Sequence, residues 1–259
     1  MKKGVMTWML VAGLSWAAST QAQTDNALQA ALNGKERSAA NVARDAARHP
    51  AQTLSFFGLK ADMTVVELAP GGGWYTEILA PYLRDHGKLI LAGVGPKLKT
   101  TLDAQAQFYD KVQIGVFEPA NKIDFAAKNS VDMVLTFRNV HNWMSVNPHA
   151  AKDVFQSAYD ALKSGGVFGV VEHRLPEAIT HDEKGSTGYV HQSHVIQLAE
   201  SVGFKLLAQS EMNANPKDNA KHENGVWALP PTLINKDKDQ AQYLSIGESD
   251  RMTLKFVKP

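Results

Sequence analysis

The chain has 259 residues, of which 44% are hydrophobic and 20% are charged, a composition typical of one large globular domain with its own core. The formal net charge is +1 and no basic cluster stands out, so no nucleic-acid partner is expected. The absence of cysteine excludes disulfides, thiolate metal sites and a lipid-modified cysteine.

The first residues have the layout of a secretory signal peptide. Met1-Lys2-Lys3 gives a basic start, residues 5–18 are mostly apolar and small, and Thr20 and Ala22 supply small residues at a cleavage site. The apolar run is shorter than the ~20 residues of a membrane span. We predict a signal peptide over 1–22, a periplasmic or secreted protein and no stable membrane insertion after cleavage. The alternative is an uncleaved anchor.

Residues 23–50 form a predicted N-terminal helical segment. The polar, Ala-rich pattern over 25–49 predicts one or two helices that are broken at Asn33-Gly34 and end at His49-Pro50. Three basic side chains are spaced to share part of one helical face: Arg37, Arg44 and Arg48. A short helix over 52–59 then opens the main domain, residues 51–259.

Strands and helices alternate along the main domain. Apolar runs predict strands over 64–68, 88–92, 112–117, 131–137, 167–171, 204–209 and 251–257. Helical spacing predicts helices over 74–83, 97–109, 148–162 and 188–202, with Gly165 and Gly166 at the end of the third. This alternation indicates an α/β protein with a Rossmann-like, doubly wound and mostly parallel sheet.

The segment over 213–247 differs from the rest of the domain. It is rich in Asn, Lys, Asp and Pro, shows no helical pattern and is too long for an ordinary connection. We predict that it is a lid or an excursion. A connection of this kind fits a last strand that runs antiparallel to the others.

The most informative motif is the glycine-rich turn after the first strand. Bare backbone there lets a ligand approach unpaired N–H groups at a helix N-terminus. A dinucleotide fingerprint lacks its third glycine here, and a P-loop lacks its lysine. What remains is an acid-x-Gly/Ala-x-Gly-x-Gly pattern, which is met by Glu67, Ala69, Gly71 and Gly73. The alternative is a turn that only lets the strand pack against its helix.

Together with residues 131–143, 162–174 and 250–259, this motif resembles the class I S-adenosylmethionine-dependent methyltransferases, and within them a group of exported bacterial predicted methyltransferases. The resemblance covers residues 50–259. It implies a seven-stranded sheet with an antiparallel last strand. It also implies that S-adenosyl-L-methionine binds across the carboxyl ends of the strands.

The resemblance also implies which residues hold the cofactor. Gly71 and Gly73 would admit its amino-acid part, Glu67 would hold its ammonium end, and Trp74 and Tyr75 would cover it. One departure is that the second strand ends in Gly93 instead of an acid that binds the ribose hydroxyls. Glu118 either reaches the ribose or adenine, or is a solvated acid. The predicted cofactor-binding residues are Glu67, Ala69, Gly71, Gly73, Trp74, Tyr75, Gly93, Glu118, Arg138 and Asn139.

Polar side chains gather after the fourth strand, where substrate should meet cofactor. Arg138 also suits a substrate carboxylate or phosphate. A histidine there could remove the acceptor's proton, and His141 is the best placed. We predict the catalytic residues His141, Asn142 and His173, and the substrate contacts Trp143 and His191. The alternative is that these residues cap helices or fill the core.

No metal site is predicted. His191 and His194 share a helix face, but no third ligand stands at metal-site spacing. The sequence therefore predicts an S-adenosylmethionine-dependent methyltransferase that acts on a small molecule. The alternative is a non-catalytic periplasmic binding protein on the same fold, which the missing acid favours. A nicotinamide oxidoreductase is disfavoured, because both its third glycine and its ribose acid are absent.

Overall fold

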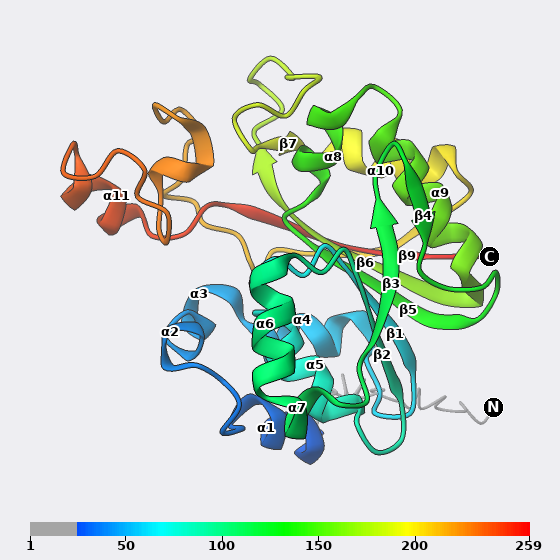
Figure 1. Cartoon of the computed structure of the whole chain (residues 1–259). Helices are drawn as coiled ribbons and strands as arrows, with labels where there is room; N and C mark the ends of the chain where they lie inside the picture. Colours follow the sequence, from blue (N-terminus) through cyan, green and yellow to red (C-terminus); the bar gives the residue numbers. More distant parts are fainter. Residues whose placement is uncertain (1–24) are drawn as a thin grey trace, which may run out of the picture.

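The computed structural model describes residues 25–259, and the predicted signal peptide over 1–22 lies outside them. Its centre is a sheet with the strand order β4-β3-β2-β1-β5-β6-β9-β8 (Figure 1). Within residues 25–259, no helix is long and apolar enough to cross a bilayer. The strands are β1 (Thr64–Leu68), β2 (Lys88–Ala92), β3 (Gln113–Glu118), β4 (Lys122–Asp124), β5 (Val131–Phe137), β6 (Leu162–Leu175), β7 (Val190–His191), β8 (Lys205–Ser210) and β9 (Arg251–Val257).

The predicted α/β architecture is confirmed. Strands β3, β2, β1, β5 and β6 pair in parallel, whereas β9 runs antiparallel to both β6 and β8. The seven predicted strands are all present, and β1, β2, β5 and β9 have the predicted bounds. Two short strands were not predicted: β4 forms a hairpin with β3, and β7 pairs with β6.

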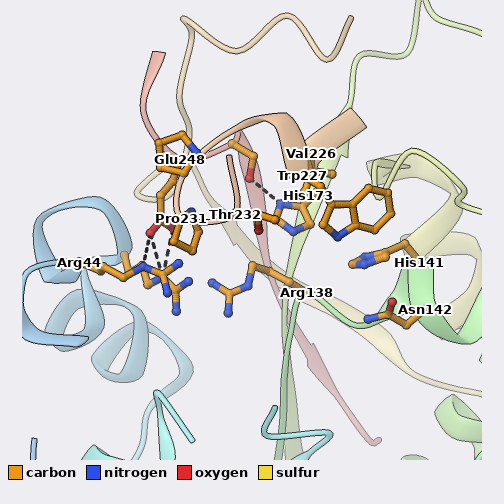
Figure 2. A pocket seen from close by; sticks show the side chains of 13 residues that line it. Arg44, Arg138, His141, Asn142, His173, Val226, Trp227, Pro231, Thr232 and Glu248 are labelled. Carbon is orange, nitrogen blue, oxygen red and sulfur yellow. Dashed lines mark hydrogen bonds and ion pairs between the residues drawn. The ribbon is translucent and has the colours of Figure 1, made fainter. Parts of the chain in front are cut away.

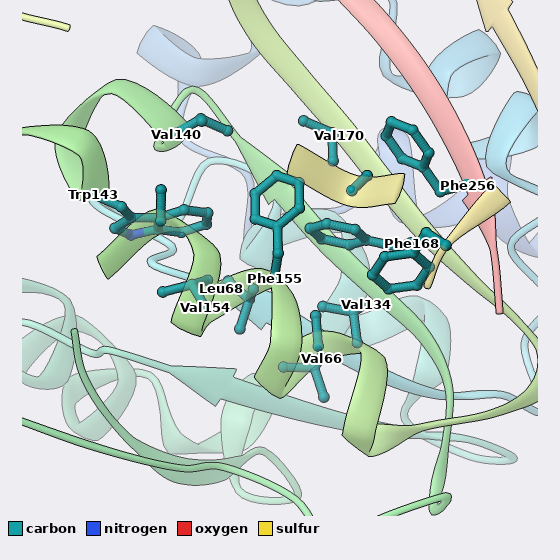
Figure 3. Close-up of a cluster of buried hydrophobic side chains, with 14 of the residues drawn as sticks. Val66, Leu68, Val134, Val140, Trp143, Val154, Phe155, Phe168, Val170 and Phe256 are labelled. Atoms are coloured by element: carbon teal, nitrogen blue, oxygen red, sulfur yellow. The ribbon is translucent and has the colours of Figure 1, made fainter. Parts of the chain in front are cut away.

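Helices cover both faces of the sheet, as a doubly wound fold requires. The helices after β1 are α5 (Thr76–Leu83), α6 (Pro96–Ala104), α7 (Ala106–Tyr109), α8 (Val140–Val146), α9 (Ala150–Ala161), α10 (Gln192–Ser201) and α11 (Gln240–Ile246). Alternate residues of β1 enter different cores: Val66 packs with Phe155 and Phe168 (Figure 3), and Val65 packs with Ile78 on the other face. This alternation is why nearly continuous apolar strands are needed.

One predicted helix end is wrong. The helix before β6 ends at Ala161 without a glycine cap, because Leu162 is already extended with φ −68° and ψ 141°. Strand β6 begins there, and its pairing with β5 shifts register between Val131 and Met133. Gly165 lies in the shifted stretch, and its N–H donates to the carbonyl of Lys258 at 2.8 Å. Its positive φ of 78° therefore belongs to an irregular bend within β6 and not to a helix C-cap.

The N-terminal segment is a series of short helices that packs beside the β1 turn. They are α1 (Asn26–Leu32), α2 (Ala39–Val42) and α3 (Asp45–Arg48), so three helices form where one or two were predicted, with the predicted break after Leu32. The helix predicted over 52–59 is α4 (Pro50–Phe57). The indole of Trp74 fixes them: its Nε1 donates to the carbonyl of Asn41 at 3.0 Å. The guanidiniums of Arg37 and Arg48 lie 5.3 and 4.7 Å from the ring centre.

Residues 213–247 form a folded excursion between β8 and β9, drawn in orange in Figure 1. It contains the 3₁₀ turn η1 (Gly225–Ala228) and the helix α11, although no helical pattern was predicted for this segment. Its start is fixed by Asn213, whose amide donates to the hydroxyls of Thr53 and Thr253 at 3.0 and 2.9 Å. Asp218 accepts from the Tyr189 hydroxyl and from the Asp250 N–H, both at 2.8 Å. These buried hydrogen bonds hold the excursion against the sheet.

We predict that Trp74→Ala lowers the free energy of unfolding by about 3–5 kcal/mol, because it removes a buried aromatic side chain and its contacts with two guanidiniums. Urea unfolding followed by circular dichroism measures the change. Leu244→Ala is the control, since that side chain is 55% exposed and its truncation should change stability by about 0.5 kcal/mol or less. Equal stability of the two variants would contradict the anchoring role of Trp74.

Candidate functional site

The glycine-rich turn leaves part of its backbone uncovered. Gly71 and Gly73 have φ of 58° and 85°, and Ala69 also has a positive φ of 48°. A Cβ on Gly71 or Gly72 would meet no atom within 4 Å, whereas one on Gly73 would lie 2.7 Å from Leu98 Cδ1. Gly73 thus lies against α6, and its positive φ of 85° favours glycine. Gly71 and Gly72 present open backbone, as the predicted ligand site requires.

Two polar side chains, Glu67 and Asn139, hold the glycine-rich turn in its conformation. Glu67 is buried and accepts from the Thr76 hydroxyl at 2.7 Å. Burial raises the pKa of Glu67 to about 7, while the Thr76 hydrogen bond and the charge of Arg138 act in the opposite direction. Asn139 donates to the carbonyls of Leu68 and Ala69, both at 3.2 Å. Its amide therefore holds the turn in shape.

The aromatic residues after the turn lie on its packed side. Trp74 faces the N-terminal helices, and Tyr75 stacks on Phe137 with ring centres 3.5 Å apart. Burial raises the pKa of the Tyr75 hydroxyl far above its ordinary value. Both rings are almost fully buried, at 6% and 4% exposed. They support the turn rather than cover its open face.

The ribose side of the predicted cofactor site has no carboxylate at the end of β2. Gly93 has φ 87°, and a Cβ there would lie 2.9 Å from Phe117 Cδ1. Glu118 is exposed and stands opposite Lys122 in the β3–β4 hairpin. The close packing of Phe117 accounts for a glycine at this position.

A cavity of about 280 Å³ lies at the carboxyl ends of β5 and β6 (Figure 2). The N-terminal segment, the strand ends and the 213–247 excursion all contribute to its walls, but the glycine-rich turn does not. It is lined by Arg44, Arg48, Arg138, His141, Asn142, His173, Val226, Trp227, Pro230, Pro231, Thr232, Glu248 and Ser249. The cavity brings together four of the predicted site residues, Arg138, His141, Asn142 and His173.

A buried carboxylate orients the histidine at one end of the cavity. Glu172 Oε1 lies 3.0 Å from His141 Nδ1, and the same carboxylate accepts the N–H groups of Val140 and His173 at 2.5 and 2.8 Å. An acceptor at Nδ1 assigns the proton to that nitrogen and leaves the lone pair on Nε2. The Trp227 ring meets the His141 ring edge to face, with centres 6.0 Å apart.

The second histidine of the cavity is held in its neutral form. His173 Nδ1 is hydrogen-bonded to the hydroxyl of Ser249. Burial and the neighbouring His141, Arg138 and Arg251 lower the pKa of His173 well below its ordinary value. Its ligating atoms and those of His141 and Glu172 lie within 4.8 Å, the one such group in residues 25–259. Because both Glu172 oxygens already accept backbone N–H groups, the arrangement suits a carboxylate–histidine pair.

Arginines dominate the other end of the cavity. Glu248 accepts from Arg44 at 2.7 Å, from Arg48 at 3.1 Å and from Arg251 at 3.0 Å. Arg138 lies between this cluster and His141 in Figure 2 and makes no ion pair with any residue of the described chain. Burial and the charges of Arg251 and Arg44 lower the pKa of Arg138 to about 10, so it stays protonated at neutral pH.

Two predicted substrate contacts lie elsewhere. Trp143 is 3% exposed and packs in the core against Phe117 and Phe155, with ring centres 5.9 and 6.4 Å away. His191 Nε2 is 2.8 Å from the carbonyl of Ile179, away from the cavity. Sequence reasoning missed Glu172, Glu248 and Trp227. Of these three, only Glu172 could have been found from the sequence, because it is an acid at the carboxyl end of a predicted strand.

No protein-family model matches the chain, and no curated protein matches it. Solved structures do. An S-adenosylmethionine-dependent methyltransferase from Aquifex aeolicus is 18% identical with a TM-score of 0.53, over 65% of this chain and 86% of that chain. Phosphoethanolamine N-methyltransferase 2 from Haemonchus contortus, solved with S-adenosyl-L-methionine, is 14% identical with a TM-score of 0.57, over 82% of this chain and 52% of that chain.

A third similar structure is the cyclase SpnF, which is 13% identical with a TM-score of 0.57, over 82% of this chain and 80% of that chain. These similarities show that the chain has the Rossmann-like fold of the class I methyltransferases. They show the fold alone, because one fold carries more than one reaction.

We predict that Glu67→Gln makes stability less dependent on pH. The pKa of Glu67 is about 7 in the folded protein and 4.5 ordinarily, so its stabilisation is complete below pH 4.5 and is lost as the pH rises towards 7. The variant should reduce that loss by at most about 3 kcal/mol, measured by urea unfolding between pH 4.5 and 8. Glu118→Gln, which neutralises an exposed carboxylate, should leave the curve unchanged. Parallel curves for wild type and Glu67→Gln would disprove the assignment.

Proposed function

We propose that the protein is an exported S-adenosylmethionine-dependent methyltransferase that acts on a small molecule. The observation that supports this most is the pairing of an open glycine backbone after β1 with an oriented histidine in a cavity at the ends of β5 and β6. In open α/β sheets, ligands bind at these carboxyl ends. The proposal of export rests on the residue pattern over 1–22.

The residues at the turn fit the amino-acid end of the cofactor. The open backbone at Gly71 and Gly72 would receive its carboxylate, and the buried Glu67 carboxyl would lie on the side of its ammonium group. At the ribose end, Gly93 offers no side chain. When bound, S-adenosylmethionine supplies an electrophilic methyl group on a cationic sulfur. Without a β2 carboxylate, two charge-assisted hydrogen bonds of about 1.5–3 kcal/mol each are missing, so we expect weak, micromolar binding.

His141 would act as the general base on the methyl acceptor. Its Nε2 lone pair is available because Glu172 accepts the proton on Nδ1. An oxygen or nitrogen acceptor must lose a proton as it attacks, and the imidazolium that forms would be stabilised by the Glu172 carboxylate. Asn142 is exposed on the same cavity wall and offers an amide to the acceptor. The rest of the catalysis is positioning of acceptor and methyl group.

The second candidate is a non-catalytic binding protein on this fold. It is favoured by Gly93 at the end of β2 and by the fact that the turn lines no part of the cavity. Under this alternative the cavity would hold a ligand, and S-adenosylmethionine would not bind.

Calorimetry separates the two candidates. Residues 23–259 should bind S-adenosylmethionine and S-adenosylhomocysteine at micromolar concentrations and should not bind NADH. Gly71→Val should abolish binding, because its side chain would enter the open space over the turn. Gly165→Val is the matched control, since that glycine also has a positive φ of 78° and open space at its Cβ, but lies in β6 outside the site. Binding that survives Gly71→Val would refute this placement of the cofactor, and no binding by wild type would favour the binding protein.

We also predict that Glu172→Gln changes the tautomer of His141. In wild type at pH 8.5, nitrogen NMR of the imidazoles should show His141 with its proton on Nδ1. In the variant the glutamine amide can donate to Nδ1, so the Nε2–H tautomer should appear. His222, which pairs with Asp218 at 2.8 Å, is the internal control and should not change. The same tautomer in both proteins would contradict the orienting role of Glu172.

A further inference from the structure

The arginine end of the cavity holds more positive charge than the described protein neutralises. Arg44, Arg48 and Arg251 share the single carboxylate of Glu248, and Arg138 has no ion-pair partner in residues 25–259. Other nearby acids are committed elsewhere: Asp45 pairs with Arg37, Glu172 pairs with His141, and Glu67 accepts from the Thr76 hydroxyl beneath the turn. Four guanidiniums therefore face one carboxylate.

These guanidiniums also retain unused donors. Arg48 is 3% exposed and lines the cavity, and its Nη1 has no hydrogen-bond partner in the described residues. The Nε of Arg251, which is also 3% exposed, is without a partner as well. A buried donor without an acceptor costs about 1–3 kcal/mol, and more when it is charged. Arg48 lines the cavity, so an anion there would lie beside its guanidinium, whereas Arg251 stands behind the lining residues.

Two of the arginines are held in place before any ligand arrives. The Trp74 ring stacks under Arg48 at 4.7 Å, and the Arg251 guanidinium donates to the carbonyl of Ala47 at 2.6 Å. The backbone of Arg138 is fixed in a left-handed conformation with φ 63°, and its backbone N–H donates to the carbonyl of Val171 at 2.7 Å. Its guanidinium has no partner in the described residues. Guanidiniums bind carboxylate and phosphate oxygens in pairs.

We propose that this cavity binds a small-molecule acid, with its carboxylate or phosphate against Arg138 and Arg48 and the rest of the molecule towards His141. The inference rests on the proposed function in one respect: if the protein is a methyltransferase, this acid is the methyl acceptor. In Figure 2, Arg44 and Glu248 lie at one end of the cavity, His141 and Asn142 lie at the other, and Arg138 lies between. An acid of a few carbon atoms would fit within the cavity volume of about 280 Å³.

Thermal denaturation of residues 23–259 at constant ionic strength tests the proposal. Succinate and inorganic phosphate are the two acidic probes, and succinamide is the neutral control for succinate. At least one acidic probe should raise the Tm, and succinamide should not. A rise with succinate alone assigns a carboxylate, and a rise with phosphate alone assigns a phosphate. Equal effects of succinate and succinamide, or no effect of either acid, would overturn the proposal.

Arg138→Gln gives the sharper test. Without a probe its Tm should be equal to or above that of wild type, because the substitution removes a half-buried charge that has no ion-pair partner and lies near other guanidiniums. Its affinity for the effective acid should be about 10- to 100-fold weaker. Arg84→Gln is the matched control, because Arg84 pairs with Asp110 at the surface outside the cavity; it should keep the wild-type affinity. If Arg138→Gln lowers the Tm and keeps the affinity, Arg138 is structural and the proposal is wrong.

Calorimetry with S-adenosylmethionine keeps the two proposals distinct. Binding of the acid without binding of S-adenosylmethionine would support the anion cavity and refute the methyltransferase. Binding of S-adenosylmethionine without binding of either acid would refute the anion cavity alone.

Discussion

A single carboxylate holds the two ends of the described chain together and shapes the cavity. Glu248 binds Arg44 and Arg48 from the N-terminal segment and Arg251 from the start of β9. Without this acid the three guanidiniums would repel one another at short range in a site of low dielectric. With it they form a stable wall that still carries excess positive charge. The same contact therefore closes the fold and gives the cavity its electrostatic character.

The chemistry of the site follows from the parallel pairing of β5 and β6. Phe137 lies opposite Val171 in the register of these strands, so the residues that follow each strand meet at one edge of the sheet. Glu172 can therefore reach the first N–H of α8, at Val140, and the ring of His141 one residue later. Neither contact could form if the strands were antiparallel, because their carboxyl ends would then lie at opposite edges.

The sheet could be predicted from the sequence because its strands are apolar runs bounded by turn residues. The position of His141 and Arg138 in the site could be predicted because ligands of open α/β sheets bind at the carboxyl ends of the strands. The sequence did not predict in which direction the aromatic side chains of Trp74 and Tyr75 point. The position of Trp74 depends on Arg37 and Arg48, which approach it from a segment outside the motif. The ion pairs of Glu248 could not be predicted either, because its partner Arg44 is 204 residues away in the sequence and no local pattern indicates such a pair.

No residue of the glycine-rich turn lines the cavity, but the positive charge of Arg138 acts on both. Arg138 lines the cavity, and its positive field lowers the pKa of Glu67 beneath the turn against the larger effect of burial. An acid bound to Arg138 would offset that field and strengthen the hold of Glu67 on its proton. A cation beside Glu67 would do the reverse and would favour the carboxylate. Arg138 therefore links the electrostatics of the cavity wall to the buried carboxyl beneath the turn.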